Sequence, residues 1–133
     1  MAQGGALLYQ IDNQSRQAVY EQIVEQVERY VLMGILHGGD KMPSVRGLSI
    51  QLNVNPNTVQ RAYTELERSG IIVTAPGRGA FISDSGGARL TERRREMNLT
   101  ELKALVAELR LTGLSKEEVL QIVENLYQEG EQV

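Results

Sequence analysis

Residues 43–83 constrain the fold of this chain more than any other segment, because they carry two helix starts and a tight turn in close succession. Ser44 directly follows a proline and stands where a helix N-cap is expected. Asn55 is a second N-cap, and Pro56 follows it at the first helical position, where its missing N–H group is not needed. A Pro-Gly-Arg-Gly turn at 76–79 then lies between two short β-prone runs. The segment therefore predicts a helix, a turn, a second helix and a β-hairpin, in that order.

The part of the chain before this segment predicts one further helix. Over residues 16–33, apolar residues recur at spacings of three and four, which is typical of an amphipathic helix. Gly34 supplies the stop signal at its end. The short apolar run at residues 7–11 is compatible either with a strand or with an arm.

The composition changes again after the hairpin. Residues 84–91 begin with Asp-Ser-Gly-Gly-Ala, a composition typical of a linker. Residues 92–133 carry two helical stretches, and a capping box of Ser115 and Glu118 opens the second one. An αα-hairpin of this size is too small to bury a core alone. We therefore expect a mainly α-helical chain with a small β-hairpin wing (α+β), in which a winged helix-turn-helix domain at 1–83 precedes a two-helix tail.

Composition excludes several classes of protein. The 133 residues include no cysteine, which rules out disulfides and thiolate zinc sites and fits a reducing compartment. The N-terminal residues lack the basic and apolar regions of a signal peptide, so we expect a cytoplasmic protein with no membrane contact. His37, the single histidine, has no potential metal ligands at suitable spacing, and no pattern places a catalytic pair. We therefore expect neither metal nor other cofactor, and no enzymatic activity.

The distribution of charge matters more than the net charge of −3, which by itself counts against nucleic-acid binding. Acidic residues gather in the first predicted helix and toward the C-terminal end. The surface expected to face DNA carries few acids and five basic residues: Lys41, Arg46, Arg61, Arg68 and Arg78. A local basic face predicts DNA binding that weakens strongly as salt is added.

The helix that begins at Pro56 separates its side chains onto two faces. The core face is predicted to consist of Val59, Ala62, Tyr63 and Leu66, and the opposite, polar face of Asn57, Gln60, Arg61, Thr64 and Arg68. Arginine can pair with guanine edges, and Asn or Gln with adenine edges, so the polar face is expected to read bases in the major groove. Two alternatives remain: a solvated face, or a surface that docks a protein. The polar face has none of the apolar anchors that docking needs.

The helix ends and the hairpin supply the remaining contacts. Asn55, Thr58 and the free N–H groups at the start of the third helix can hold a phosphate. Arg46 is expected on the helix that crosses the sugar-phosphate backbone, whereas Ser44 is equally a cap or a phosphate contact. Gly77 lets the hairpin tip approach DNA closely, and Arg78 is expected along a backbone or in the minor groove. A solvated arginine at an ordinary turn is the alternative.

Several of these motifs occur in the order and spacing of the GntR family of bacterial transcription regulators, which the chain resembles over residues 8–83. The resemblance rests on Tyr20-Glu21-Gln22-Ile23, Gly39-Asp40-Lys41-Met42-Pro43-Ser44-Val45-Arg46, Val54-Asn55-Pro56-Asn57-Thr58-Val59, Ala62-Tyr63-Thr64-Glu65-Leu66-Glu67 and Gly77-Arg78-Gly79-Ala80-Phe81-Ile82. It implies a sequence-specific, DNA-binding transcription regulator. It also implies DNA contacts by Arg46, Asn55, Asn57, Thr58, Gln60, Gly77 and Arg78, which with Ser44 and Arg61 form the predicted DNA-binding set.

The short two-helix tail is similar to that of the YtrA subfamily, in which it serves dimerisation. This resemblance implies a repressor encoded beside genes for an ABC transporter linked to envelope or antibiotic stress. An apolar stripe needs a partner, and a symmetric dimer presents two recognition helices to a palindromic operator of double-stranded DNA. The predicted dimerisation residues are Leu102, Leu105, Leu109, Val119, Val123 and Leu126. The alternative is that they close a core within one chain, and an unknown small-molecule effector also stays open.

Overall fold

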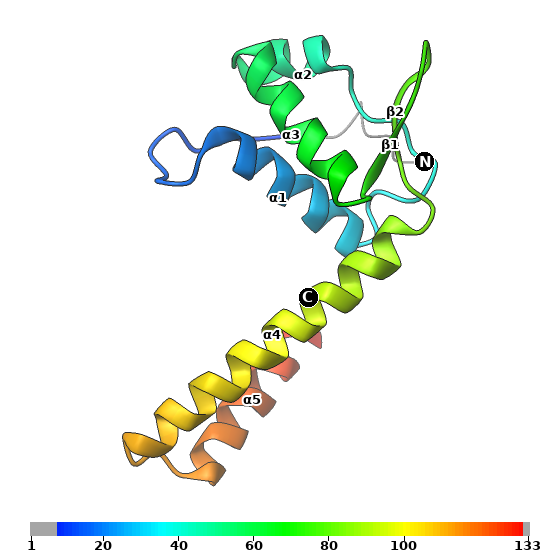
Figure 1. Ribbon diagram of the computed structural model, residues 1–133. Helices are drawn as coiled ribbons and strands as arrows, with labels where there is room; N and C mark the ends of the chain where they lie inside the picture. The colour runs from blue at the N-terminus through cyan, green and yellow to red at the C-terminus, as the bar shows by residue number, and fades with distance from the viewer. Residues whose placement is uncertain (1–7, 132–133) are drawn as a thin grey trace. The chain divides into compact units, whose positions relative to one another are not determined.

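The computed structural model describes residues 8–131 and confirms the expected class, a mainly helical chain with one antiparallel hairpin (Figure 1). The elements in chain order are α1 (Val19–Leu32), α2 (Val45–Leu52), α3 (Pro56–Arg68), β1 (Ile72–Ala75), β2 (Gly79–Ile82), α4 (Gly86–Leu111) and α5 (Lys116–Glu131). The chain divides into two compact units, with the boundary between Arg93 and Arg94. None of the helices within residues 8–131 is long and apolar enough to cross a lipid bilayer.

The first unit is organised around α3, which packs against α1, α2 and β1. Its core is continuous and takes side chains from every element from α1 to the start of α4. The largest fully buried side chains are Ile23, Val27, Leu36, Met42, Leu48, Val59, Leu66, Ile71, Ile72 and Leu90. This core fixes the orientation of α3, because the buried face of that helix is anchored along its whole length.

Both predicted helix caps of the helix-turn-helix are confirmed. The Ser44 hydroxyl accepts a hydrogen bond from the Gly47 N–H at 2.9 Å, and the Asn55 side-chain oxygen accepts one from the Asn57 N–H at 2.8 Å. Between the two helices, Asn53 ends α2 in the left-handed conformation with φ of 56°. Asparagine tolerates this conformation better than most residues, which explains how the turn stays tight without glycine.

The hairpin pairs Ile72 with Ile82 at its base and Ala75 with Gly79 at its tip. Residues 39–42 extend it on the other side of β2 through three backbone hydrogen bonds at 2.8 Å: Gly39 N–H to Ile82, Ile82 N–H to Asp40 and Met42 N–H to Ala80. The sequence His37-Gly38-Gly39-Asp40 is typical of a turn, and nothing in it predicts this edge. The added edge ties the wing to the segment that leads directly into α2.

The prediction of a linker at residues 84–91 is corrected by the structure, because α4 begins at Gly86 and the residues that follow are helical. Gly86 and Leu90 are buried, and a Cβ atom at Gly86 would lie 2.8 Å from the carbonyl oxygen of Gly70. Farther along α4, the Arg93 guanidinium pairs with Glu28 of α1 at 3.4 Å. The small residues that suggested flexibility instead permit close packing of the first turns of α4 on the winged-helix unit.

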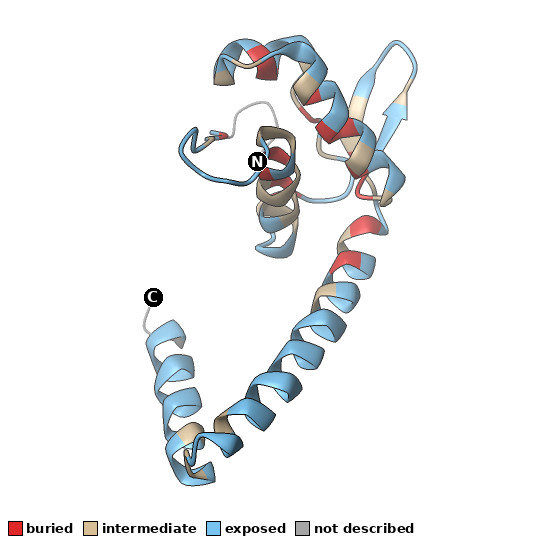
Figure 2. Ribbon diagram, turned by 60° about the vertical axis from the view of Figure 1, so that its left-hand side comes forward, coloured by how far each residue is buried: buried red, intermediate tan, exposed pale blue. Residues whose placement is uncertain are grey.

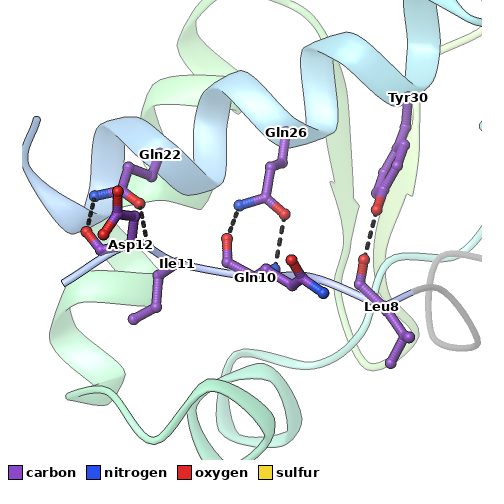
Figure 3. Close-up of a pocket in the computed structure, with 7 residues that line it drawn as sticks. All are labelled: Leu8, Gln10, Ile11, Asp12, Gln22, Gln26 and Tyr30. Atoms are coloured by element: carbon purple, nitrogen blue, oxygen red, sulfur yellow. Dashed lines mark hydrogen bonds between the residues drawn. The ribbon is translucent and has the colours of Figure 1, made fainter. Parts of the chain in front are cut away.

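Of the two alternatives for residues 7–11, the structure favours an arm over the part that it describes, and residue 7 lies outside the described residues. The backbone of residues 8–12 is extended along α1 without joining the sheet (Figure 3). Side-chain amides of α1 bond to it: Gln22 accepts from the Asp12 N–H at 2.7 Å, and Gln26 accepts from the Gln10 N–H at 2.8 Å. Both amides also donate to the carbonyls of the same arm residues, and the Tyr30 hydroxyl donates to that of Leu8.

Tyr9 anchors this arm in the core. Its side chain is buried, and its ring meets that of Tyr30 edge to face with centroids 5.6 Å apart. Burial raises the pKa of the Tyr9 hydroxyl, and this hydroxyl has no hydrogen-bond partner within residues 8–131. The arm is therefore held by packing and by its backbone, and the sequence pattern assigned Tyr9 no role.

Candidate nucleic-acid interface

The two faces of α3 are as the sequence predicts. Its core residues are buried, and all five residues of the polar face are exposed. Three of these five have partners on α3 itself: Gln60 donates to the Thr64 hydroxyl at 3.4 Å, and Arg68 pairs with Glu65 at 2.9 Å. Asn57 lies nearer the start of the helix, where base edges are most accessible to a recognition helix.

Arg61 lies differently from the other residues of the polar face. Its guanidinium carbon is 3.8 Å from the centroid of the Tyr20 ring, which belongs to α1. A cation over an aromatic face is attracted by the ring's quadrupole. The Arg61 side chain therefore reaches back from α3 onto α1.

The N-cap side chains of α3 and α2 each make their cap hydrogen bond and keep further polar groups for a ligand. The Asn55 oxygen is engaged by Asn57, which leaves the Asn55 amide N–H groups for a further partner. Ser44 accepts from Gly47, so its own hydroxyl proton is still available to a phosphate. In both residues the cap role is therefore compatible with a phosphate contact, which stays a prediction. Arg46 is exposed and takes part in no ion pair within residues 8–131.

The wing tip needs glycine for its conformation. Gly77 and Gly79 have φ of 76° and 110°, which side chains rarely adopt, and Arg78 stands exposed between them. The Arg78 N–H closes the turn by bonding to the Ala75 carbonyl at 2.9 Å. Lys41 from the added edge lies beside the tip, with its Cε atom 3.4 Å from the Cβ position of Gly79. Two cations therefore flank the same turn.

A groove of about 220 Å³ lies between α3 and the wing. It brings Ser44 and Gln60 of the predicted set together with Thr74, whose hydroxyl the sequence analysis did not single out. No local signal in the sequence marks Thr74, because its position in the groove depends on where the hairpin packs. At the wall of the groove, the Tyr63 hydroxyl donates to the Pro43 carbonyl at 2.6 Å, and burial raises its pKa. Glu67 also lines this groove and would repel a phosphate.

A second groove, between the arm and α1, offers less to a ligand. It is lined by Leu8, Gln10, Ile11 and Asp12 of the arm and by three side chains of α1 (Figure 3). The Gln22 and Gln26 amides that line it are bonded to the arm backbone. Within the described residues, no group of three or more His, Cys, Asp or Glu side chains could hold a metal ion, and His37 pairs with Asp40 in a turn.

The second unit is exposed along most of α4 and α5 (Figure 2), and its exposed residues include many apolar side chains. Four of the six predicted dimerisation residues are exposed, namely Leu102, Leu105, Val123 and Leu126. Leu109 and Val119 are half-buried and line an apolar groove of about 650 Å³ at the bend between the two helices. The predicted N-cap of α5 is confirmed, since Ser115 accepts from the Glu118 N–H at 3.1 Å, and the Glu118 carboxylate accepts from the Ser115 hydroxyl rather than from its backbone N–H. Between α4 and α5, as the structure describes them, these six side chains do not form a closed core.

Known proteins share both the sequence and the arrangement of these elements. A family model described as "Bacterial regulatory proteins, gntR family" matches residues 19–82. The HTH-type transcriptional repressor YtrA of Bacillus subtilis is 43% identical over 112 residues, which cover 84% of this chain and 86% of that protein.

Two solved structures extend the similarity to the tail. A transcriptional regulator from Oenococcus oeni is 33% identical and superposes with a TM-score of 0.74, covering 88% of this chain and 97% of that one. YtrA from Sulfolobus acidocaldarius, a GntR-family transcription factor, is 31% identical with a TM-score of 0.61, covering 75% and 99%.

Proposed function

This chain belongs to the GntR family of bacterial regulatory proteins, and we propose that it is a dimeric repressor that binds a palindromic operator of its own operon. It is a transcription regulator of the YtrA type, with a winged-helix DNA-binding domain, and not an enzyme. The observation that carries the proposal is the set of uncovered polar and basic groups on α2, α3 and the wing.

The proposed contacts divide by what each group can reach. Asn57 and Gln60 point from the exposed side of α3 and are proposed to read base edges. Arg46 is proposed to contact a phosphate from α2, and Arg78 to contact the backbone or the minor groove from the wing. Ser44, Asn55 and Thr58 hold phosphate at the two helix starts, and Gly77 lets the tip approach.

Dimerisation is proposed to occur through the tail. The exposed leucines of α4 and α5 form an apolar stripe of the kind that marks a protein–protein interface. A second copy has the same stripe, and an isologous contact would cover both at once. Two copies related by a two-fold axis would then match the two halves of a palindrome.

The regulated genes follow from the resemblance to the YtrA subfamily. We propose a cytoplasmic repressor whose operon encodes an ABC transporter linked to envelope or antibiotic stress. The apolar groove near Leu109 and Val119 is the proposed binding site for a small-molecule effector. Such a ligand would bias the dimer by binding close to the proposed interface.

The test is binding of the purified protein to DNA from immediately upstream of its own gene, with scrambled DNA of equal length as the control, at two salt concentrations. We expect tight binding to the upstream DNA alone, and a footprint with half-sites about 34 Å apart or a multiple of it. Equal and weak binding to both DNAs at low salt, lost at high salt, would contradict an operator in that region.

A further inference from the structure

The contact between Arg61 and Tyr20 joins a residue of α3 to a residue of α1. Tyr20 is the second residue of α1 and is half-buried, so its ring is fixed by the core against which it packs. Arg61 is exposed, and its guanidinium lies over one face of that ring at 3.8 Å. A long, flexible side chain on a surface helix is thereby held in one place.

The contact with the Tyr20 ring leaves the N–H donors of Arg61 available for a ligand. The five N–H groups of a guanidinium lie in its plane, whereas an aromatic ring covers a face. In the part of the chain that the structure describes, Arg61 makes no ion pair, and the nearby carboxylate of Glu65 is taken by Arg68 at 2.9 Å. Tyr20 therefore restrains Arg61 without consuming the groups with which it would bind an anion.

The direction of the side chain decides between the two targets that DNA offers. To reach a base edge, Arg61 would have to extend from α3 into the major groove and leave the ring. While stacked, it stays over α1, where the N–H groups at the edge of its plane can bind two oxygens of a phosphate but lie away from the base-reading end of α3.

We infer that Tyr20 is a positioning residue that presents Arg61 to a DNA phosphate rather than to a base edge. This inference rests on the proposed function, and it departs from the sequence-based expectation that Arg61 reads bases. A restrained arginine loses less conformational freedom on binding, so the stack raises affinity for every DNA sequence alike.

The first experiment compares Arg61→Ala with Asn57→Ala. The dissociation constant is measured for the footprinted operator and for operators with single base changes, over a range of salt concentrations. We expect Arg61→Ala to weaken binding about tenfold on all of these DNAs and to lower the salt slope by about 1. Asn57→Ala, the matched control on the same face, should change the order of preference among them.

The second experiment asks whether Tyr20 acts through Arg61. Tyr20→Phe keeps the aromatic face and should bind as the wild type does, whereas Tyr20→Met keeps apolar bulk without that face and should bind more weakly. In an Arg61→Ala background, Tyr20→Met should cause no further loss, because the partner is already gone. A merely structural role for Tyr20 would reduce binding by the same factor in both backgrounds.

The outcomes separate this inference from the proposed function. If the wild type selects no DNA sequence, the proposed function fails before any variant is compared. If the wild type selects its operator and Arg61→Ala changes base preference, or leaves affinity and salt slope unaltered, only the phosphate role is overturned. Should Tyr20→Met fail to fold in thermal melts, Arg61→Ala and a wild-type-like Tyr20→Phe still decide the question.

Discussion

The two units of this chain contain similar amphipathic helices but differ in what covers the apolar face. In the winged-helix unit, Leu66 is 0% exposed and belongs to a core shared by several elements. In the tail, Leu105 is 57% exposed and Leu126 is 59% exposed. Apolar periodicity thus identifies a face that must be buried, but it does not say whether the same chain or another copy buries it.

The largest difference between the units should appear when one leucine is truncated in each. Leu66→Ala removes buried volume from a packed core, so we expect the free energy of unfolding of the winged-helix unit to fall by about 2–5 kcal/mol. Leu105→Ala, measured at concentrations where the chain is monomeric, should change the free energy of unfolding of the tail by less than about 0.5 kcal/mol. Urea denaturation followed by circular dichroism measures both, and equal losses would contradict the comparison.

A charge placed on the exposed apolar stripe of the tail should prevent dimerisation. We expect the double variant Leu105→Asp, Leu126→Asp to be monomeric, because a carboxylate cannot be desolvated in an apolar interface. Its operator affinity should fall on the order of a hundredfold, since two linked DNA-binding units become independent. Light scattering after gel filtration gives the mass, against 14.8 kDa for one chain.

Lys103→Asp introduces the same group beside the stripe and serves as the control for this prediction. It should leave the mass and the affinity close to those of the wild type. Dimers that persist in the double variant would place the interface elsewhere in the chain.

The start of α4 tests where the winged-helix unit ends. Gly86→Ala would put a Cβ atom against backbone atoms of Gly70 and Ile71, at 2.8 and 3.1 Å, and we expect a loss of about 1–3 kcal/mol in stability. At Gly87 the corresponding atom would make an ordinary contact with Val31 at 3.4 Å. Gly87→Ala should therefore gain up to about 1 kcal/mol from helix propensity. Similar thermal unfolding of the two variants would argue against tight packing here.

The smallest expected effect separates two buried tyrosines of the winged-helix unit. Tyr63→Phe removes the hydrogen bond to the Pro43 carbonyl, and we expect it to cost about 1 kcal/mol. Tyr9→Phe removes a hydroxyl without a partner within residues 8–131, so stability should stay level or rise slightly. Chemical denaturation of both variants checks the order, and a greater loss for Tyr9→Phe would indicate a partner for that hydroxyl.

The sequence was sufficient where a signal and its structure lie close together. Ser44, Asn55 and Ser115 cap the helices that they precede, because a cap depends only on the next few residues. The hairpin and the two faces of α3 follow from local periodicity in the same way. The predicted DNA-binding roles of Arg46, Asn57 and Arg78 stay predictions until binding is measured.

Features that depend on distant partners were missed or wrong. The glycines at the start of α4 suggested a linker because only the approach of residue 70, far away in the chain, explains them. The strand-like edge at 39–42 and the place of Thr74 in the groove depend on how the wing packs. The stack of Arg61 on Tyr20 joins two helices, and the spacing of residues within either helix does not reveal it.

The arm along α1 shows how a helix can serve as the edge of a sheet. Gln22 and Gln26 are four residues apart, a rise of about 6 Å on a helix, and Asp12 and Gln10 are two residues apart, about 6.6 Å on an extended chain. The two spacings nearly match, so side-chain amides stand in for a neighbouring strand. Since the helix recognises the arm through its peptide groups, position 10 should accept most side chains, while 22 and 26 should accept almost none but glutamine. Position 12 should accept fewer, because the Asp12 carboxylate also accepts a hydrogen bond from the Gln14 N–H at 2.9 Å.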